Sequence, residues 1–456
     1  MRLWTCLIAA LWLAMPGAAT ARDFYFGADL SFANEMEDCG AKFTDDGQAA
    51  DPFAIFRAHG ANLVRVRIWN DPDWTHYSNL ADVKKTIARA RAQGLQVLLD
   101  FHYSDDWADG DKQLVPKAWA GLHDPEALVK ALHDYTYDTL ISLDRDGLMP
   151  DMVQVGNETN APMLGGKKGE PIAWARNARL LNAGITAVRE AGAKSAIKPR
   201  VMLHIAQPEN VELWFQAAYA AGVTDFDVIG MSYYAKWSTQ SFRGLGGVIN
   251  RLRHRYGVDV VVVETAYPWT LDNADTSPDV LGQDSVVPGY PASPEGQARY
   301  LGDLTQAVIS SGGVGVVYWA PDWVSTRCKT RWGEGSSWDN ATFFDFRHQL
   351  LPAIDFMKRP YDQLVDVTFK VKDAAVAKDR PLYLWGDFLG ARDFVVHLQP
   401  DGQGAWTYAT RLAPGQTVRF QVYDQLPLTA GLLKADGGYS KDVVGATGTV
   451  IERTAP

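Results

Sequence analysis

Two glutamates in this sequence end apolar stretches that have the composition of buried strands. Glu158 closes the stretch VQVGNE (153–158), and Glu264 closes the stretch VVVE (261–264). Two carboxyl groups on either side of a glycosidic bond can cleave it, because one serves as acid and base and the other as nucleophile. A single such glutamate is more often a capping or ion-pairing residue, so this chemistry requires a fold that brings the two together.

Eight apolar segments alternate with segments of helical periodicity. Strands are expected at residues 24–29, 63–69, 96–101, 152–156, 201–205, 226–232, 259–264 and 314–319. Helices are expected at residues 79–93, 125–146, 172–190 and 294–311. The pattern predicts an α/β fold, a (β/α)8 barrel over residues 22–360. An open doubly wound sheet is the alternative, but no G-x-G-x-x-G follows the first strand.

Barrels of this kind hold their active sites at the C-terminal ends of the strands. The fourth and seventh strands face each other there, so Glu158 and Glu264 are expected to lie about 5–5.5 Å apart, the spacing of a retaining enzyme. Polar or aromatic residues follow nearly every strand, which predicts a pocket. Its candidate residues are Arg65, His102, Asp105, Trp107, Asn157, His204, Tyr234 and Trp319.

Some of these candidates allow a second interpretation. Arg65 belongs to a strand expected to be buried, where an unpaired guanidinium would be very costly. We expect it to keep a nucleophilic carboxylate ionised, and the alternative is a structural ion pair inside the barrel. His102 and His204 could be hydrogen-bonded core residues, and Trp107 could pack its loop.

Composition narrows the class of protein. The chain has 456 residues, a net charge of −10 and 16 tryptophans. The acidic balance argues against nucleic acid as a partner. Tryptophans offer flat apolar faces on which sugar rings can stack, although a large core also uses them.

The first 21 residues have the organisation of a secretory signal peptide. Arg2 precedes a short apolar stretch, and Ala19-Thr20-Ala21 is an A-x-A cleavage site. Cleavage near Ala21 predicts a secreted or periplasmic protein. No other stretch is long and apolar enough for membrane insertion. The mature chain would keep Cys39 and Cys328, as a disulfide or as free thiols.

A different pattern begins near residue 361. Residues 367–371, 394–398 and 418–422 alternate apolar and polar side chains, and the dipeptides at 401–402 and 414–415 supply turns. This predicts a small β-sandwich module over residues 361–456. Trp385 and Trp406 could form a sugar-binding platform, but core packing is the favoured interpretation.

The sequence resembles the arabinogalactan endo-β-1,4-galactosidases of glycoside hydrolase family 53, in the (β/α)8 clan A. The resemblance is carried, in chain order, by GADLS (27–31), VRVRIWNDP (64–72), DFHYSDDWAD (100–109), VQVGNE (153–158), MSYY (231–234), VVVETAYP (261–268), SPEGQ (293–297), VYWAPDW (317–323) and SSWDN (336–340). These stretches span the barrel, and the second and third are the most specific. The C-terminal module lies outside the resemblance.

The resemblance implies a retaining hydrolase of β-1,4-galactan or galacto-oligosaccharides that needs no cofactor for its chemistry. Glu158 would be the acid/base and Glu264 the nucleophile. Asn157 would bond to the 2-hydroxyl of the sugar being cleaved. Tyr234 matches a tyrosine that bonds to the nucleophile, and Trp319 matches the residue stacked under that sugar. The matched pocket positions with less certain roles are His102, Asp105, Trp107 and His204. A monomer is expected.

Three departures from the family pattern bear on subsites rather than on cleavage. Leu164-Gly165-Gly166 stands where the family has Leu-Trp-Pro, so a stacking surface is expected to be lost or replaced. Ala320 stands where a glutamate is usual. Ala206-Gln207 stands where an aspartate is common.

The loops after the seventh and eighth strands carry two further expectations. Oxygen side chains recur at Asn273, Asp275, Ser277 and Asp279, a spacing that suits Ca²⁺. Bacterial relatives bind calcium between these loops, and Ser336 and Asp339 match there; a solvated acidic loop is the alternative. Cys39 and Cys328 follow the first and eighth strands, which are neighbours in a closed barrel, so a Cys39–Cys328 disulfide is predicted.

Two competing functions remain open. Another clan-A β-glycanase, such as a mannanase or xylanase, would use the same chemistry with different subsite loops. DFHYSDDWAD argues against it. A non-catalytic glycan-binding protein with a decayed barrel is the other, and the presence of Glu158, Glu264, Asn157 and Arg65 argues against decay.

Overall fold

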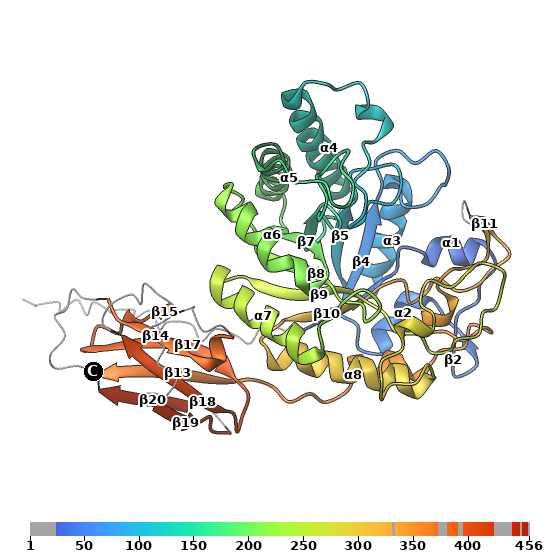
Figure 1. The fold of residues 1–456 in the computed structure, drawn as a ribbon. Helices are drawn as coiled ribbons and strands as arrows, with labels where there is room; N and C mark the ends of the chain where they lie inside the picture. Colours follow the sequence, from blue (N-terminus) through green and yellow to red (C-terminus); the bar gives the residue numbers. More distant parts are fainter. Residues whose placement is uncertain are drawn as a thin grey trace, which may run out of the picture.

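The computed structural model describes residues 24–330, 333–372, 381–390, 395–423, 440–446 and 449–454. A barrel forms the larger part, and a smaller all-β module follows it (Figure 1). The expected signal peptide lies outside the described residues. Within the described chain, none of the helices combines the length and the apolar character needed to cross a membrane.

Eight parallel strands form a closed barrel in the order β1-β10-β9-β8-β7-β6-β5-β4. They are β1 (Tyr25–Asp29), β4 (Leu63–Ile68), β5 (Gln96–Phe101), β6 (Met152–Val155), β7 (Arg200–Ala206), β8 (Val228–Ser232), β9 (Asp259–Thr265) and β10 (Gly315–Tyr318). Each expected strand is found with its ends displaced by at most two residues. The predicted (β/α)8 barrel is therefore confirmed.

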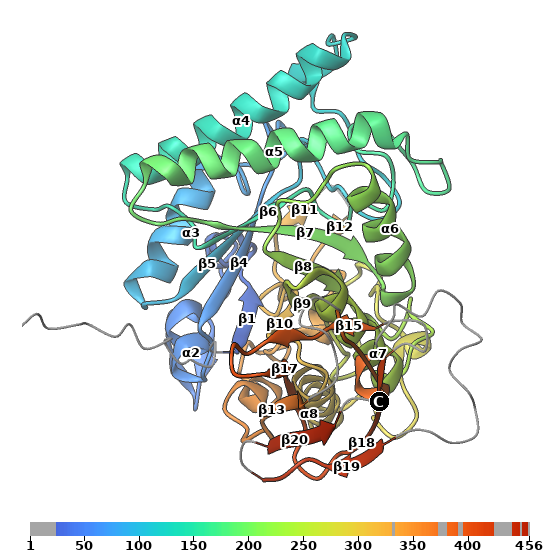
Figure 2. The same cartoon turned by 90° about the vertical axis from the view of Figure 1, so that its left-hand side faces the viewer.

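Helices connect the strands and cover the outside of the barrel (Figure 2). They are α1 (Ala33–Asp38), α2 (Pro52–Ala58), α3 (Leu80–Ala92), α4 (Pro125–Arg145), α5 (Trp174–Lys194), α6 (Pro208–Ala220), α7 (Phe242–Tyr256) and α8 (Pro294–Ser310). Side chains accept hydrogen bonds from the first-turn N–H groups of five of them, at Asp51, Asn79, Asp124, Ser241 and Ser293. These caps fix where each helix begins after its loop.

An apolar layer fills the barrel interior. It is a cluster of buried side chains contributed by all the strands except β1, namely Leu63, Leu98, Met152, Met202, Val228, Val261, Val263 and Val317. At Gly230 a Cβ would lie 2.7 Å from the sulfur of Met202, so glycine is required for this packing. The layer fills the interior of the barrel, and the polar groups lie beyond it at the C-terminal ends of the strands.

The C-terminal module is a sandwich of two four-stranded sheets, as predicted. The sheets have the orders β16-β17-β13-β20 and β15-β14-β18-β19. The strands are β13 (Val365–Lys372), β14 (Tyr383–Gly386), β15 (Val396–His397), β16 (Gln399–Pro400), β17 (Ala405–Leu412), β18 (Thr417–Tyr423), β19 (Ser440–Val443) and β20 (Thr449–Thr454). Trp385 is buried, and Trp406 packs against the module's core, in agreement with a packing role.

Helix α7 joins the module to the barrel. Nδ1 of His254 lies 2.7 Å from the hydroxyl of Tyr408, and Arg253 donates to Oγ1 of Thr410 at 3.2 Å. Both residues are near the C-terminal end of α7, which leads into the start of β9. The module therefore contacts the barrel at the end opposite to the one where the strands finish (Figure 1).

A disulfide links the loops after β1 and β10. Cys39 and Cys328 are paired, with Cα atoms 5.6 Å apart and 289 positions between them in sequence. Because β1 and β10 are hydrogen-bonded neighbours, the bridge lies across the place where the barrel closes.

Replacing both cysteines by serine should lower stability by about 2–4 kcal/mol, because the unfolded chain loses a long cross-link. Urea unfolding of the wild type and the double variant measures this difference. Intact-mass analysis after alkylation without reductant should detect no labelled thiol in the mature wild type; two labelled thiols would contradict the bridge.

Candidate active site

A buried guanidinium organises the C-terminal end of the barrel. Arg65, on β4, is 1% exposed. Its Nη1 lies 2.8 Å from Oδ2 of Asp29, and its Nη2 lies 2.8 Å from both Oδ2 of Asp100 and Oε1 of Glu264. Burial of an arginine with three carboxylates satisfies charges that would otherwise be very costly to remove from water. The ion pair expected between Arg65 and Glu264 is present, and two further carboxylates join it.

Asn157 is held from several sides. Its Oδ1 accepts a hydrogen bond from Arg65 at 2.8 Å, and its Nδ2 donates to the carbonyl of Ala108 at 2.8 Å. His204 lies with Nδ1 2.9 Å from that Oδ1 and Nε2 2.9 Å from Oγ of Ser232. Burial lowers the pKa of His204 well below its ordinary value, so the imidazole is neutral.

His102 supports the loop that Asn157 contacts. Its Nε2 lies 3.0 Å from Oδ2 of Asp100, and its Nδ1 accepts from the N–H of Ala108 at 3.1 Å. Both histidines are almost completely buried. They lie behind the cavity wall and position the groups that line it, so the core interpretation describes them better than direct contact with a ligand.

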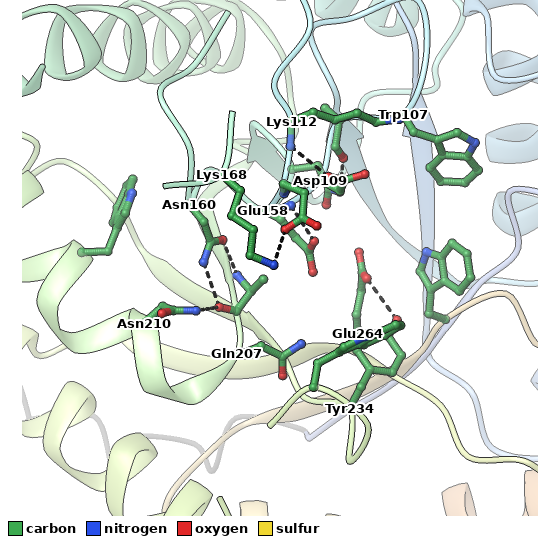
Figure 3. Close-up of a pocket in the computed structure, with 18 of the residues that line it drawn as sticks. Trp107, Asp109, Lys112, Glu158, Asn160, Lys168, Gln207, Asn210, Tyr234 and Glu264 are labelled. Atoms are coloured by element: carbon green, nitrogen blue, oxygen red, sulfur yellow. Dashed lines mark hydrogen bonds and ion pairs between the residues drawn. The ribbon is translucent and has the colours of Figure 1, made fainter. Parts of the chain in front are cut away.

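The two glutamates point into one cavity (Figure 3). Glu158 has a φ of 41°, a left-handed conformation that a non-glycine residue rarely adopts. Its Oε2 accepts from the N–H of Gly110 at 3.1 Å, and its Oε1 accepts from the hydroxyl of Ser232. Oε2 of Glu264 accepts from the hydroxyl of Tyr234 at 3.1 Å. The first carboxyl therefore has only uncharged hydrogen-bond donors, whereas the second has a cation.

Burial raises the pKa of both glutamates. That of Glu264 rises to about 8, where Arg65 opposes the rise and the charge of Glu158 adds to it. Two carboxyl groups in one cavity resist simultaneous ionisation, so the pair retains one proton near neutral pH. An arrangement with one acid and one carboxylate can both donate a proton and supply a nucleophile.

The cavity has a volume of about 1050 Å³ and is rich in tryptophan. The predicted residues Trp107, Asn157, Glu158, Tyr234, Glu264 and Trp319 line it. Tryptophans not singled out from the sequence line it as well, namely Trp174, Trp214, Trp237, Trp323 and Trp338. Alternating flat apolar faces and hydrogen-bonding groups suit sugar rings, which have both kinds of surface.

Asp105, like Arg65, His102 and His204, is a predicted pocket residue that does not line the cavity. Its carboxylate accepts from the N–H groups of Asp71 and Lys117, at 2.9 and 2.7 Å. It ties two loops together and is not among the residues lining the cavity. A part for Asp105 in binding the substrate stays a prediction.

Arg67 fixes the position of Trp107. Its guanidinium carbon lies 4.4 Å from the ring centre of Trp107, 4.2 Å from that of Phe32 and 4.9 Å from that of Trp69. These contacts are cation–π interactions in a buried setting. Trp107 is thus held by its packing and also exposed to the cavity, so both of its possible roles apply.

The departure at Leu164-Gly165-Gly166 forms a tight turn. A Cβ at Gly166 would lie 2.4 Å from the carbonyl oxygen of Pro162, and Leu164 is buried. The turn presents no aromatic surface. Trp174, at the start of α5, lines the same cavity and packs against Trp214 with ring centres 5.3 Å apart. The turn therefore supplies no stacking surface, and tryptophans from α5 and α6 line the cavity.

The loops expected to hold calcium meet, but most of their oxygens have other partners. Asp275 accepts from the N–H of Ser277 and of Ser336, and Asn273 accepts from the N–H of Asp275. Oδ1 of Asp279 and of Asp339 are buried without a hydrogen-bond partner, and burial raises the pKa of Asp279 to about 8.

These two carboxyls fit a cation. However, no group of three or more acidic, histidine or cysteine side chains that could hold a metal occurs in the described chain. Calcium here stays a prediction.

An eight-stranded barrel with two glutamates in an aromatic cavity at its C-terminal end defines a glycoside hydrolase. Residues 25–357 match the family model described as glycosyl hydrolase family 53. The chain therefore belongs to glycosyl hydrolase family 53.

Named relatives agree. An arabinogalactan endo-beta-1,4-galactanase from Cellvibrio japonicus is 53% identical over 78% of this chain and 95% of its own. An endo-beta-1,4-galactanase from Bacillus subtilis is 35% identical over 73% and 85%. The solved GH53 catalytic domain of Ignisphaera aggregans has a TM-score of 0.69 and 34% identity, and covers 76% of this chain and 98% of its own.

Arg65→Met should destabilise the protein by about 3–5 kcal/mol, because three buried carboxylates lose their cation. The loss should be smaller at pH 5 than at pH 8, because unpaired buried carboxyl groups take up protons. Urea unfolding at both pH values measures this. Arg189→Met is the matched control: Arg189 pairs with Asp225 and Asp227 at the surface, so its loss should cost less than about 1 kcal/mol.

If Asp279 and Asp339 bind calcium, EDTA should lower the Tm and excess Ca²⁺ should restore it. Asp279→Asn should abolish this response. Differential scanning calorimetry in the two conditions is the measurement, and a wild-type transition that EDTA leaves unchanged would exclude the site.

Proposed function

We propose that this protein is a retaining endo-β-1,4-galactanase that hydrolyses type I (arabino)galactan. The observation that carries the proposal is the placement of Glu158 and Glu264 in one cavity, one with uncharged donors and the other paired with Arg65. The substrate follows from the resemblance to galactanases, the nearest of those reported above being 53% identical.

Glu264 acts as the nucleophile. Arg65 and the hydroxyl of Tyr234 both donate to its carboxylate, which favours the ionised form at the moment of attack. Its carboxylate forms a bond to the anomeric carbon as the bond to the leaving oxygen breaks. Water then attacks the same carbon, releases Glu264 and restores the original anomeric configuration.

Glu158 acts first as acid and then as base. It gives its proton to the leaving oxygen, and afterwards it takes a proton from the attacking water. The hydroxyl of Ser232 can rotate, so it can donate to Glu158 as a carboxylate and accept from Glu158 as an acid. Neutral His204 on the other side of Ser232 adds no charge that would favour one state.

Asn157 and two tryptophans position the sugar. Asn157 lines the cavity next to Glu158 and is fixed by Arg65 and the Ala108 carbonyl, so its amide can meet the 2-hydroxyl in a set orientation. Trp319 offers its ring under the sugar being cleaved, and Trp107 lies with its ring centre 5.9 Å from that of Trp319.

Glu158→Gln and Glu264→Gln should each lower kcat on galactan by at least about 1000-fold, because each removes a reacting group. Reducing-sugar release from galactan, mannan and xylan measures activity and substrate choice. Azide should partly restore Glu264→Gly, since it can enter the space left by the nucleophile.

Glu126→Gln, on the outer helix α4, is the control and should keep full activity. Release from mannan or xylan alone would establish another β-glycanase, and no release from any of the three would favour a glycan-binding protein.

The pH profile of kcat/KM should be bell-shaped. Activity requires Glu158 protonated and Glu264 ionised, so it should fall at high pH, where Glu158, whose pKa burial raises, loses its proton, and fall again at acidic pH, where Glu264 becomes protonated. Initial rates across pH 3–10 test this, and a flat profile through pH 9 would contradict a shared proton.

We further propose that the protein is exported and that it acts as a monomer without a cofactor. The support for export is the A-x-A site ending at Ala21, and the monomer and the absence of a cofactor rest on the family resemblance. N-terminal sequencing of the mature protein should begin at Arg22, and retention of the first 21 residues would contradict export by this route.

A further inference from the structure

Gln207 occupies a backbone conformation that favours glycine. It follows β7 and precedes α6, with a φ of 64° and a ψ of 134°. A side chain at this φ crowds its own backbone, and such residues persist only where the surroundings determine them. This makes Gln207 a strained residue on the rim of the cavity.

The surroundings of Gln207 hold it firmly. Both backbone groups of Ala206 are bound by the side-chain amide of Asn160, at 2.8 and 3.0 Å, and Asn210 donates to the same carbonyl at 2.9 Å. The N–H of Gln207 donates to the carbonyl of Ser232 at 3.1 Å. Pro208 then begins α6. The strained turn is therefore built into the fold rather than being a mobile loop.

The side chain of Gln207 faces the cavity from the side of the two glutamates opposite to Trp107 (Figure 3). Its Oε1 is buried and has no hydrogen-bond partner among the described residues. An amide oxygen without a protein partner is under-satisfied until a ligand supplies a donor. Gln207 lines the cavity, so a ligand hydroxyl can reach its amide.

We propose that Gln207 is a specificity-determining residue that binds a hydroxyl group of the glycan portion that leaves in the first step. The proposal rests on the proposed function. In the proposed mechanism, Trp107 and Trp319 contact the sugar that becomes bonded to Glu264. The opposite side of the two glutamates therefore receives the glycan portion that leaves.

The strain itself supplies the discriminating test. Glycine at position 207 would relieve the positive φ and would remove the amide. If the side chain only filled space, Gln207→Gly would change stability alone. If the side chain binds substrate, the same variant keeps or raises the Tm and loses activity selectively.

The experiment compares two substrates. For Gln207→Gly, kcat/KM on β-1,4-galactohexaose should fall about threefold to tenfold, the value of one hydrogen bond to a neutral group. On 4-nitrophenyl β-1,4-galactobioside, whose leaving group is not a sugar, it should stay within twofold. Gln207→Met keeps the strain and the length of the side chain but removes both polar atoms without adding charge, so it should show the same selective loss and covers the case in which the glycine variant fails to fold.

Asp46→Gly is the matched control. Asp46 also has a positive φ, 47°, in an exposed turn between β2 (Thr44–Asp45) and β3 (Gln48–Ala49), and its replacement should leave both activities unchanged. Unchanged kcat/KM on the hexasaccharide, or an equal loss on both substrates, would overturn the proposal. If the wild type cleaves xylan or mannan instead of galactan, the proposed function fails, and the role of Gln207 is then decided with the matching oligosaccharide and aryl glycoside.

Discussion

The architecture of the site depends on burying one guanidinium among carboxylates. Arg65 cannot leave water without partners, and Asp29, Asp100 and Glu264 on three other strands supply them. These three strands must therefore end at the same level along the barrel axis, each with its carboxylate side chain directed into the barrel. The same cation that balances the buried carboxylates also places Glu264, so the stability of the barrel end and the ionisation of the proposed nucleophile have one physical origin.

The groups around this ion cluster give the two glutamates different surroundings. Glu158 comes from a turn with a left-handed φ and contacts a backbone N–H and a hydroxyl, whereas Glu264 contacts a guanidinium. The histidines behind the wall are uncharged or paired with Asp100, so they fix geometry without changing which glutamate is ionised. Two identical side chains thus have different electrostatic surroundings, as the two proposed roles require.

Periodicity was sufficient to predict the barrel, because buried parallel strands are continuous apolar runs and helices repeat every three or four residues. Residues at strand ends, such as Glu158 and Tyr234, could be assigned to one pocket for the same reason. Trp174 and Trp214 could not be assigned to the pocket. They belong to helices, and which helical side chains face the cavity depends on the conformation of the preceding loops. The backbone contacts of Asp105 could not be predicted either, because a loop aspartate that caps backbone N–H groups has the same sequence context as one that faces a ligand.

The position of the disulfide has a topological consequence. Cys39 follows β1 and Cys328 follows β10. The bridge therefore closes a covalent ring that contains the seven other barrel strands, β4 to β10. A single cut by a protease anywhere between those two cysteines leaves both fragments attached to one another. One such cut would open a loop without separating Glu158 from Glu264, and inactivation by dissociation would require either two cuts or a reductant.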